Sequence, residues 1–166
     1  MKKFITENFR FTITVTKGGG CRNGHEIGDT YTCEYGCPMP LGDESGICVE
    51  AMIKMFPLLE IVRSGGDLRT LGGSEKHKIE ITCPDGPIKF LIEGVDLMEI
   101  RQIKANPPQH SFGCFIGDKI IGNLNLTDTG SGAYEIEDLS VLREYHHFGY
   151  EQQLLEFAKN YMASHR

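Results

Sequence analysis

The segment with the clearest chemical meaning is Tyr134–His165, which combines a strand pattern, a polar loop and a helix pattern. The strand part alternates apolar and polar residues, and its apolar members are Ile136, Leu139 and Val141. Residues 143–149 form a polar loop ending in glycine, and helical spacing then follows in Leu154, Leu155, Ala158, Tyr161 and Met162. Free N–H groups and the positive dipole end at the start of such a helix favour negative charge. The pattern therefore predicts a site for the phosphates of a cofactor.

The same segment resembles motif A of the GNAT superfamily of N-acetyltransferases. In that motif a strand ending in Leu-x-Val precedes a loop with Arg/Gln-x-x-Gly-x-Gly/Ala and a leucine-rich helix. Leu139-Ser140-Val141 matches the strand end, Gly149 the first glycine and Leu154-Leu155 the helix. The resemblance implies that the strand end holds the pantetheine arm of acetyl-CoA and that the loop amides hold its pyrophosphate. The implied cofactor-binding residues are Leu139, Ser140, Val141, His146, His147, Phe148, Gly149, Tyr150 and Glu151.

Two positions depart from the motif. His146 stands at the Arg/Gln position, and Glu151 stands where the second glycine is expected. A carboxylate near two phosphates in a partly screened site costs on the order of one to a few kcal/mol. We therefore expect Glu151 to weaken the binding of the cofactor.

The resemblance also implies a mechanism, in which an amine attacks the acetyl thioester directly. A carboxylate would remove the ammonium proton, and an amide of the strand would polarise the carbonyl. Glu137 is the first candidate for this base, because it alternates with core positions on the strand that leads to the loop, and Glu135 is the second. The alternative is that both carboxylates lie on the solvated face of an edge strand. Tyr161 could serve as an acid, but its place on the helical stripe favours core packing.

The resemblance extends upstream to about residue 98. Cys114–Leu126 reads as a hairpin whose two apolar runs flank Gly117-Asp118. A complete GNAT domain continues beyond the motif A helix with a fifth strand, so we expect an open sheet edge at the cofactor groove. A second subunit, as in a homodimer, would complete the fold; alternatively, the unit is a degenerate, non-catalytic module for binding or dimerisation.

Two modules are expected, meeting near residue 97: an uncharacterised cysteine-containing α+β module (1–97) and a GNAT-like partial acetyltransferase domain (98–166). The fold class is α+β, the second module being antiparallel strands followed by one long C-terminal helix. In the first module the patterns predict strands at 11–16, 30–34, 78–83 and 88–93, and a helix at 48–61. Pro57 is expected to break that helix.

The first module resembles a short uncharacterised prokaryotic protein family, and this resemblance implies no activity. The residues that carry it are Gly18–Asp29 (with Cys21, Gly24, His25 and Asp29), Gly46-Ile47-Cys48, Phe56-Pro57, Gly65-Gly66 and Cys83-Pro84-Asp85.

Chemistry in the first module depends on its cysteines. Cys21, His25, Cys48 and Cys83 could provide three thiolates and one imidazole, a tetrahedral set that suits zinc. Cys33-x-x-x-Cys37 offers a second pair. None of the spacings is the tight C-x-x-C of a zinc ribbon, and free cysteines are often buried without a ligand role. A zinc site, a reactive or redox thiol and ordinary core cysteines are the three alternatives.

Composition narrows the class of partner. The net charge is −6, with 40% hydrophobic and 24% charged residues, which is ordinary for a soluble globular protein. Residues 1–97 hold 11 basic and 14 acidic groups, and residues 98–166 hold 6 and 9. Neither half is basic, so nucleic acid and anionic membranes are not expected partners. No signal peptide or membrane span is recognised, which predicts a cytoplasmic protein with mostly reduced thiols.

The expected function is therefore acetyl-CoA-dependent N-acetyl transfer to an unidentified small-molecule or peptide amine. The alternative is a non-catalytic GNAT-like binding or dimerisation module fused to a thiol- or zinc-binding domain.

Overall fold

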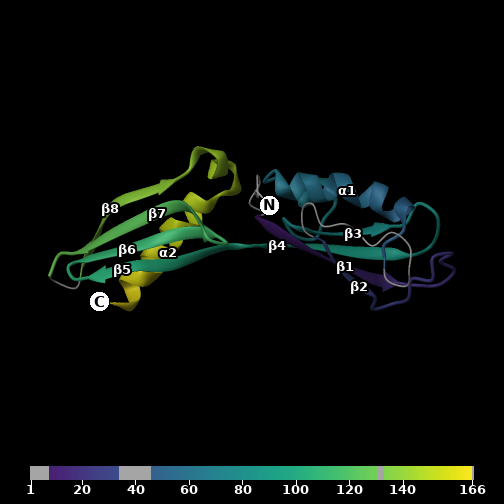
Figure 1. Ribbon diagram of the computed structural model, residues 1–166, viewed down its shortest axis with the longest axis horizontal. Coiled ribbons are helices and arrows are strands. Elements are labelled where there is room, and N and C mark those ends of the chain that lie inside the picture. Colours follow the sequence, from purple (N-terminus) through teal and green to yellow (C-terminus); the bar gives the residue numbers. More distant parts are fainter. Residues whose placement is uncertain (1–7, 34–45, 131–132, 166) are drawn as a thin grey trace. The chain divides into compact units, whose positions relative to one another are not determined.

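The computed structural model describes residues 8–33, 46–130 and 133–165 (Figure 1). The chain divides into two compact units, one comprising Glu7–Asp96 and the other including Leu97–Arg166. This division falls beside residue 97, where the sequence places the module boundary. That each unit is a separate domain stays a prediction.

The first unit is built on an antiparallel sheet of four strands in the order β2-β1-β4-β3. The strands are β1 (Phe9–Lys17), β2 (Thr30–Cys33), β3 (Lys78–Thr82) and β4 (Lys89–Asp96). In β1 every second residue from Phe9 to Val15 is buried, whereas Arg10 is exposed. This period of two places one apolar face of the sheet against the core. The predicted strands are present, with bounds shifted by a few residues at most.

One helix covers that apolar face. Helix α1 (Val49–Arg63) contributes Ala51, Met55, Leu59 and Val62 to the core. Pro57 lies inside the helix, so the expected break is wrong. Pro57 is exposed. Because proline has no N–H, one carbonyl of the helix lacks its usual donor, and this carbonyl lies on the side of the helix that water reaches. A short 3-10 helix, η1 (Leu68–Leu71), follows and buries Leu68.

The second unit is a meander of four antiparallel strands in the order β5-β6-β7-β8. These are β5 (Met98–Asn106), β6 (Gln109–Ile116), β7 (Lys119–Asp128) and β8 (Tyr134–Val141). The expected hairpin is formed by β6 and β7, which turn at Gly117 and Asp118. The 3-10 helix η2 (Arg143–Phe148) and helix α2 (Tyr150–Ser164) follow β8. The predicted α+β class, with antiparallel strands followed by one C-terminal helix, is confirmed.

Helix α2 packs on one face of this sheet, as Figure 1 shows. Tyr150, Leu154 and Ala158 of the helix are fully buried. The sheet residues buried in this core are Phe112, Cys114, Ile116, Ile121, Leu124, Leu126 and Val141. At the far end of α2, Tyr161 packs between aromatic rings and donates or accepts a hydrogen bond with His110 Nδ1 at 3.1 Å. Tyr161 is thus a packing residue, as its helical spacing favours.

None of the helices in the described ranges is long and apolar enough to cross a lipid bilayer.

Two histidines of the first unit make its stability depend on pH. Burial lowers the pKa of His25, although the negative charge of Asp29 raises it in part. Burial, together with the positive charge of Lys76, lowers the pKa of His77. Below about pH 6.5 these two histidines therefore bind more protons in the unfolded chain than in the folded chain. We expect the free energy of unfolding to fall between about pH 7.5 and about pH 5.5, as measured by urea titration with circular dichroism.

Carboxylates explain little of this window, because unfolded aspartates and glutamates titrate near pH 4. The His77→Gln variant should show a smaller difference between the two pH values than the parent. An equal difference in both proteins would contradict the assignment to His77.

Candidate functional site

Strand β8 changes register against β7 at the first candidate base. Ile136 and Asp138 pair with consecutive residues of β7, so Glu137 is an extra residue with no partner across the ladder. Such a β-bulge bends a strand and redirects a side chain, and bulges are frequent beside active sites. In a regular strand, residues three positions apart point to opposite faces. The extra residue in the bulge places Ile136 and Leu139 on the same face.

β8 is an edge strand within the sheet that the structure describes. Its inner groups pair with β7, and the backbone groups that point the other way can bind a ligand or another strand. The predicted Leu139, Ser140 and Val141 occupy the end of this strand, opposite Leu124, Asn123 and Gly122 of β7. Glu135 and Glu137 are exposed, whereas Val141 is buried. The strand end therefore offers backbone, rather than large side chains, to a ligand.

The polar loop of the sequence prediction is the 3-10 helix η2. Its Tyr145 and Phe148 are buried, and Tyr150 at the start of α2 is fully buried. The rings of Phe148 and Tyr150 stack with centroids 5.4 Å apart. Phe148 and Tyr150 therefore serve the core with their side chains, and any contact with a cofactor is limited to their backbone. His147 is exposed.

Gly149 joins η2 to α2 in the left-handed conformation, with φ of 82°. A Cβ at this position would meet no atom within 4 Å, so the space beside the backbone is open. Gly149 is the N-cap of α2, and no side chain caps the helix. The amides of Glu151 and Gln152 in the first turn have no carbonyl partner within the helix. These are the groups that the predicted diphosphate site requires.

The two departures from the motif lie against this site. His146 Nε2 is 2.8 Å from the carbonyl oxygen of Val141 and donates to it in the tautomer that carries hydrogen on Nε2. The same Nε2 is 3.5 Å from a carboxylate oxygen of Glu151. The strand-end carbonyl therefore has a donor within the chain, and the Glu151 carboxylate lies next to the uncapped turn.

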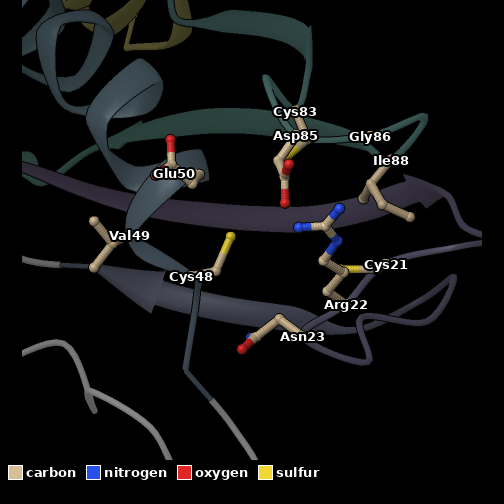
Figure 2. A pocket seen from close by; sticks show the side chains of 10 residues that line it. All are labelled: Cys21, Arg22, Asn23, Cys48, Val49, Glu50, Cys83, Asp85, Gly86 and Ile88. Atoms are coloured by element: carbon tan, nitrogen blue, oxygen red, sulfur yellow. The ribbon is translucent and has the colours of Figure 1, made fainter.

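A second site lies in the first unit, where a cavity of about 230 Å³ is lined by Cys21, Cys48 and Cys83. Figure 2 shows the Cys48 sulfur directed into this space, with Arg22 and Asp85 pointing toward one another beside it. Cys21 and Cys48 are partly exposed and Cys83 is buried, and all three are free thiols. Three of the four predicted zinc ligands are thus brought to one cavity.

The other two cavity thiols affect the pKa of Cys83. Burial raises the pKa of Cys83, a backbone hydrogen bond from Asp85 lowers it, and negative charge on Cys48 or Cys21 raises it again. An interaction with the Cys48 side chain also raises the pKa of Cys83. The Cys83 thiol therefore loses its proton less readily than a free cysteine does.

His25 takes no part in the cysteine cluster. Its Nδ1 is 2.8 Å from the Tyr31 hydroxyl, its Nε2 is 3.4 Å from the Asn23 side-chain nitrogen, and its ring packs edge-on against Phe90. The Asn23 amide donates to Nε2, so Nδ1 carries the hydrogen. Among the residues that the structure describes, no group of three or more His, Cys, Asp or Glu side chains is arranged to hold a metal ion. Cys33 is buried, and Cys37 lies outside the described residues.

The cavity also contains polar residues that the sequence interpretation did not select. Arg22 and Asn23 directly follow Cys21, and Asp85 lies two positions after Cys83. Their nearness to the cysteines in the chain was the available signal. What the sequence could not show is that the two segments face the same space.

Comparison with known proteins gives one result. A sequence model of the acetyltransferase (GNAT) family matches residues 79–166, which begin in β3 and include all described elements of the second unit. No curated protein and no solved structure matches the chain.

The left-handed conformation of Gly149 yields a stability prediction. Gly149→Ala should lower the free energy of unfolding by about 1–2 kcal/mol, because a Cβ disfavours the left-handed backbone conformation. No steric clash should add to this cost, since no neighbouring atom lies within 4 Å of the new Cβ. Gly149→Asn should cost less, because asparagine adopts the left-handed region more readily. Urea unfolding followed by circular dichroism measures both. Equal stability of the alanine variant and the parent would argue against a left-handed residue 149.

Proposed function

The chain belongs to the GNAT acetyltransferase family, and from this premise we propose that its second unit transfers an acetyl group from acetyl-CoA to an amine. The observation that carries the proposal is the path from the open edge of β8, through the left-handed Gly149, into the uncapped first turn of α2. An edge strand and free helical amides suit a long ligand with a diphosphate. The acceptor is a small-molecule or peptide amine.

The residues present are suited to acetyl-CoA. The outward backbone groups of Leu139–Val141 would hold the pantetheine arm, and the amides of Glu151 and Gln152 would hold the diphosphate. The open space beside Gly149 lets phosphate oxygens approach the backbone. When bound, acetyl-CoA supplies a thioester whose carbonyl carbon accepts a nucleophile.

Glu137 is the proposed base. It is the extra residue of the β8 bulge and is exposed, and no hydrogen bond or ion pair holds its carboxylate among the described residues. The carboxylate removes a proton from the ammonium group of the acceptor, which frees the nitrogen lone pair for attack. Glu135 is the second candidate, on the same strand and also exposed.

A second candidate function is non-catalytic binding or dimerisation. The bond between His146 and the Val141 carbonyl favours it, because a group expected to face the cofactor already has a partner. In that case the open edge of β8 would pair with a strand of a second copy, giving a homodimer. Light scattering after size exclusion separates a dimer from a monomer.

Removing the charge of Glu151 tests the cofactor site. Glu151→Gln should tighten acetyl-CoA binding about fivefold, because roughly 1 kcal/mol of repulsion with the diphosphate is lost. Isothermal titration calorimetry gives the dissociation constants. Glu156→Gln is the matched control, since Glu156 is exposed on the same helix, one and a half turns further from its N-terminus. This variant should bind as the parent does.

If neither the parent nor Glu151→Gln binds acetyl-CoA at millimolar ligand, acetyl transfer is rejected and the binding module is the better account. Equal tightening in Glu151→Gln and Glu156→Gln would indicate a long-range charge effect and not a diphosphate beside residue 151.

The role of Glu137 is tested by its amide. With a mixture of primary amines as acceptors and labelled acetyl-CoA, Glu137→Gln should lower the rate of acetylated product by about 10²–10⁴, the usual contribution of a general base. Its affinity for acetyl-CoA should stay unchanged. The rate is followed by mass spectrometry of the acetylated amine. A larger loss in Glu135→Gln than in Glu137→Gln would transfer the role to Glu135.

A further inference from the structure

The cavity of the first unit gathers thiols from three distant segments. Cys21 lies in the loop after β1, Cys48 is the N-cap residue before α1, and Cys83 directly follows β3. All three line the same space of about 230 Å³ (Figure 2). The other two cysteines described, Cys33 and Cys114, are buried and do not line it.

Two of these thiols form an unequal pair. Cys48 is partly exposed and points into the cavity, whereas Cys83 is buried. Of the other two cavity thiols, Cys48 affects the pKa of Cys83 more strongly than Cys21 does. An accessible thiol that points into the cavity is placed to attack. A neighbouring buried thiol is placed to displace whatever becomes attached.

The surrounding loops hold this pair in place. The backbone N–H of Cys83 donates to the Ile88 carbonyl at 2.8 Å, across the turn that joins β3 and β4. The Asn23 side chain donates to the Gly46 carbonyl at 3.3 Å and so ties the loop of Cys21 to the segment that precedes Cys48. The backbone N–H of Glu26 donates to Asp29 at 2.8 Å and closes the turn of that loop. The cavity walls are therefore connected to one another.

We propose that Cys48 and Cys83 are a reactive dithiol that reduces small-molecule disulfides, with Cys48 as the attacking thiol and Cys83 as the resolving thiol. The cavity of about 230 Å³ has room for a disulfide and the groups next to it, so the remaining substituents of the substrate must be flexible and lie outside it. This activity is independent of acetyl transfer, because every residue it uses lies in the first unit.

The reaction is two thiol–disulfide exchanges. The Cys48 thiolate attacks one sulfur of the substrate, the substrate S–S bond breaks, a Cys48 mixed disulfide forms and the first substrate thiolate leaves. Cys83 then gives its proton to solvent and attacks the Cys48 sulfur, which releases the second substrate thiolate. The substrate gains two electrons and the protein loses two as the Cys48–Cys83 disulfide forms.

A single-turnover assay on the reduced, chelator-treated full chain tests the proposal, with glutathione disulfide as the probe. Chromatography of released glutathione and mass mapping of tryptic peptides are the readouts. We expect about two equivalents of glutathione per chain and a Cys48–Cys83 disulfide. Cys83→Ser should release about one equivalent and keep glutathione on Cys48. Cys48→Ser should lose at least about tenfold in rate.

Cys21→Ser is the matched control, because Cys21 lines the same cavity without belonging to the pair; its rate should stay within about threefold of the parent. Circular dichroism checks the folding of each variant. If a variant does not fold, the peptide map of the parent still shows whether the Cys48–Cys83 disulfide forms. A disulfide or mixed disulfide mainly at Cys21, or no reaction, overturns the proposal. So does one equivalent of zinc that binds tightly to the parent and is lost in Cys48→Ser, which would identify a metal site.

Discussion

The burial of one apolar face per sheet is the constraint on which the rest of this protein depends. Among the residues that the structure describes, each unit has one four-stranded antiparallel sheet and one long helix that covers it. Side chains alternate between the faces of a strand, so the need to bury one set determines the register of every strand. The bulge in β8 changes this alternation locally. Because Glu137 leaves the ladder, Ile136 and Leu139 lie on the same face, where Leu139 is half-buried and Ile136 is exposed.

The start of α2 shows how packing leaves backbone groups available. Phe148 and Tyr150 on either side of Gly149 are buried, which anchors the end of η2 and the beginning of α2 to the core. The chain must change direction between these anchors, and a left-handed glycine makes the turn. As a result the amides of Glu151 and Gln152 have neither an intrahelical carbonyl nor a capping side chain. The side chains of His146 and Glu151 then modify this site, the first by bonding to Val141 and the second by adding negative charge.

The cysteine cavity depends on loops. Cys21 lies in the loop after β1, Cys48 directly precedes α1 and Cys83 directly follows β3. The residues that flank the thiols in sequence have mainly structural tasks. His25 gives both ring nitrogens to Tyr31 and Asn23, and its neutral form is favoured by burial. Because its ring nitrogens bond to Tyr31 and Asn23, the His25 imidazole does not join the thiols, although His25 is close to Cys21 in the sequence.

The sequence by itself determined the elements whose residues repeat with a regular period. The strands, the hairpin at Gly117, helix α2 and the strand–glycine–helix order around Gly149 were all predictable, because local periodicity and turn chemistry are written in neighbouring residues. The continuity of α1 through Pro57 was not predictable, since the cost of the lost hydrogen bond depends on whether the freed carbonyl can reach water, and tertiary packing decided that. The pairing of Cys48 with Cys83 and the diversion of His25 were also decided by tertiary structure. Contacts between segments tens of residues apart depend on how sheets and helices pack, and no local pattern records them.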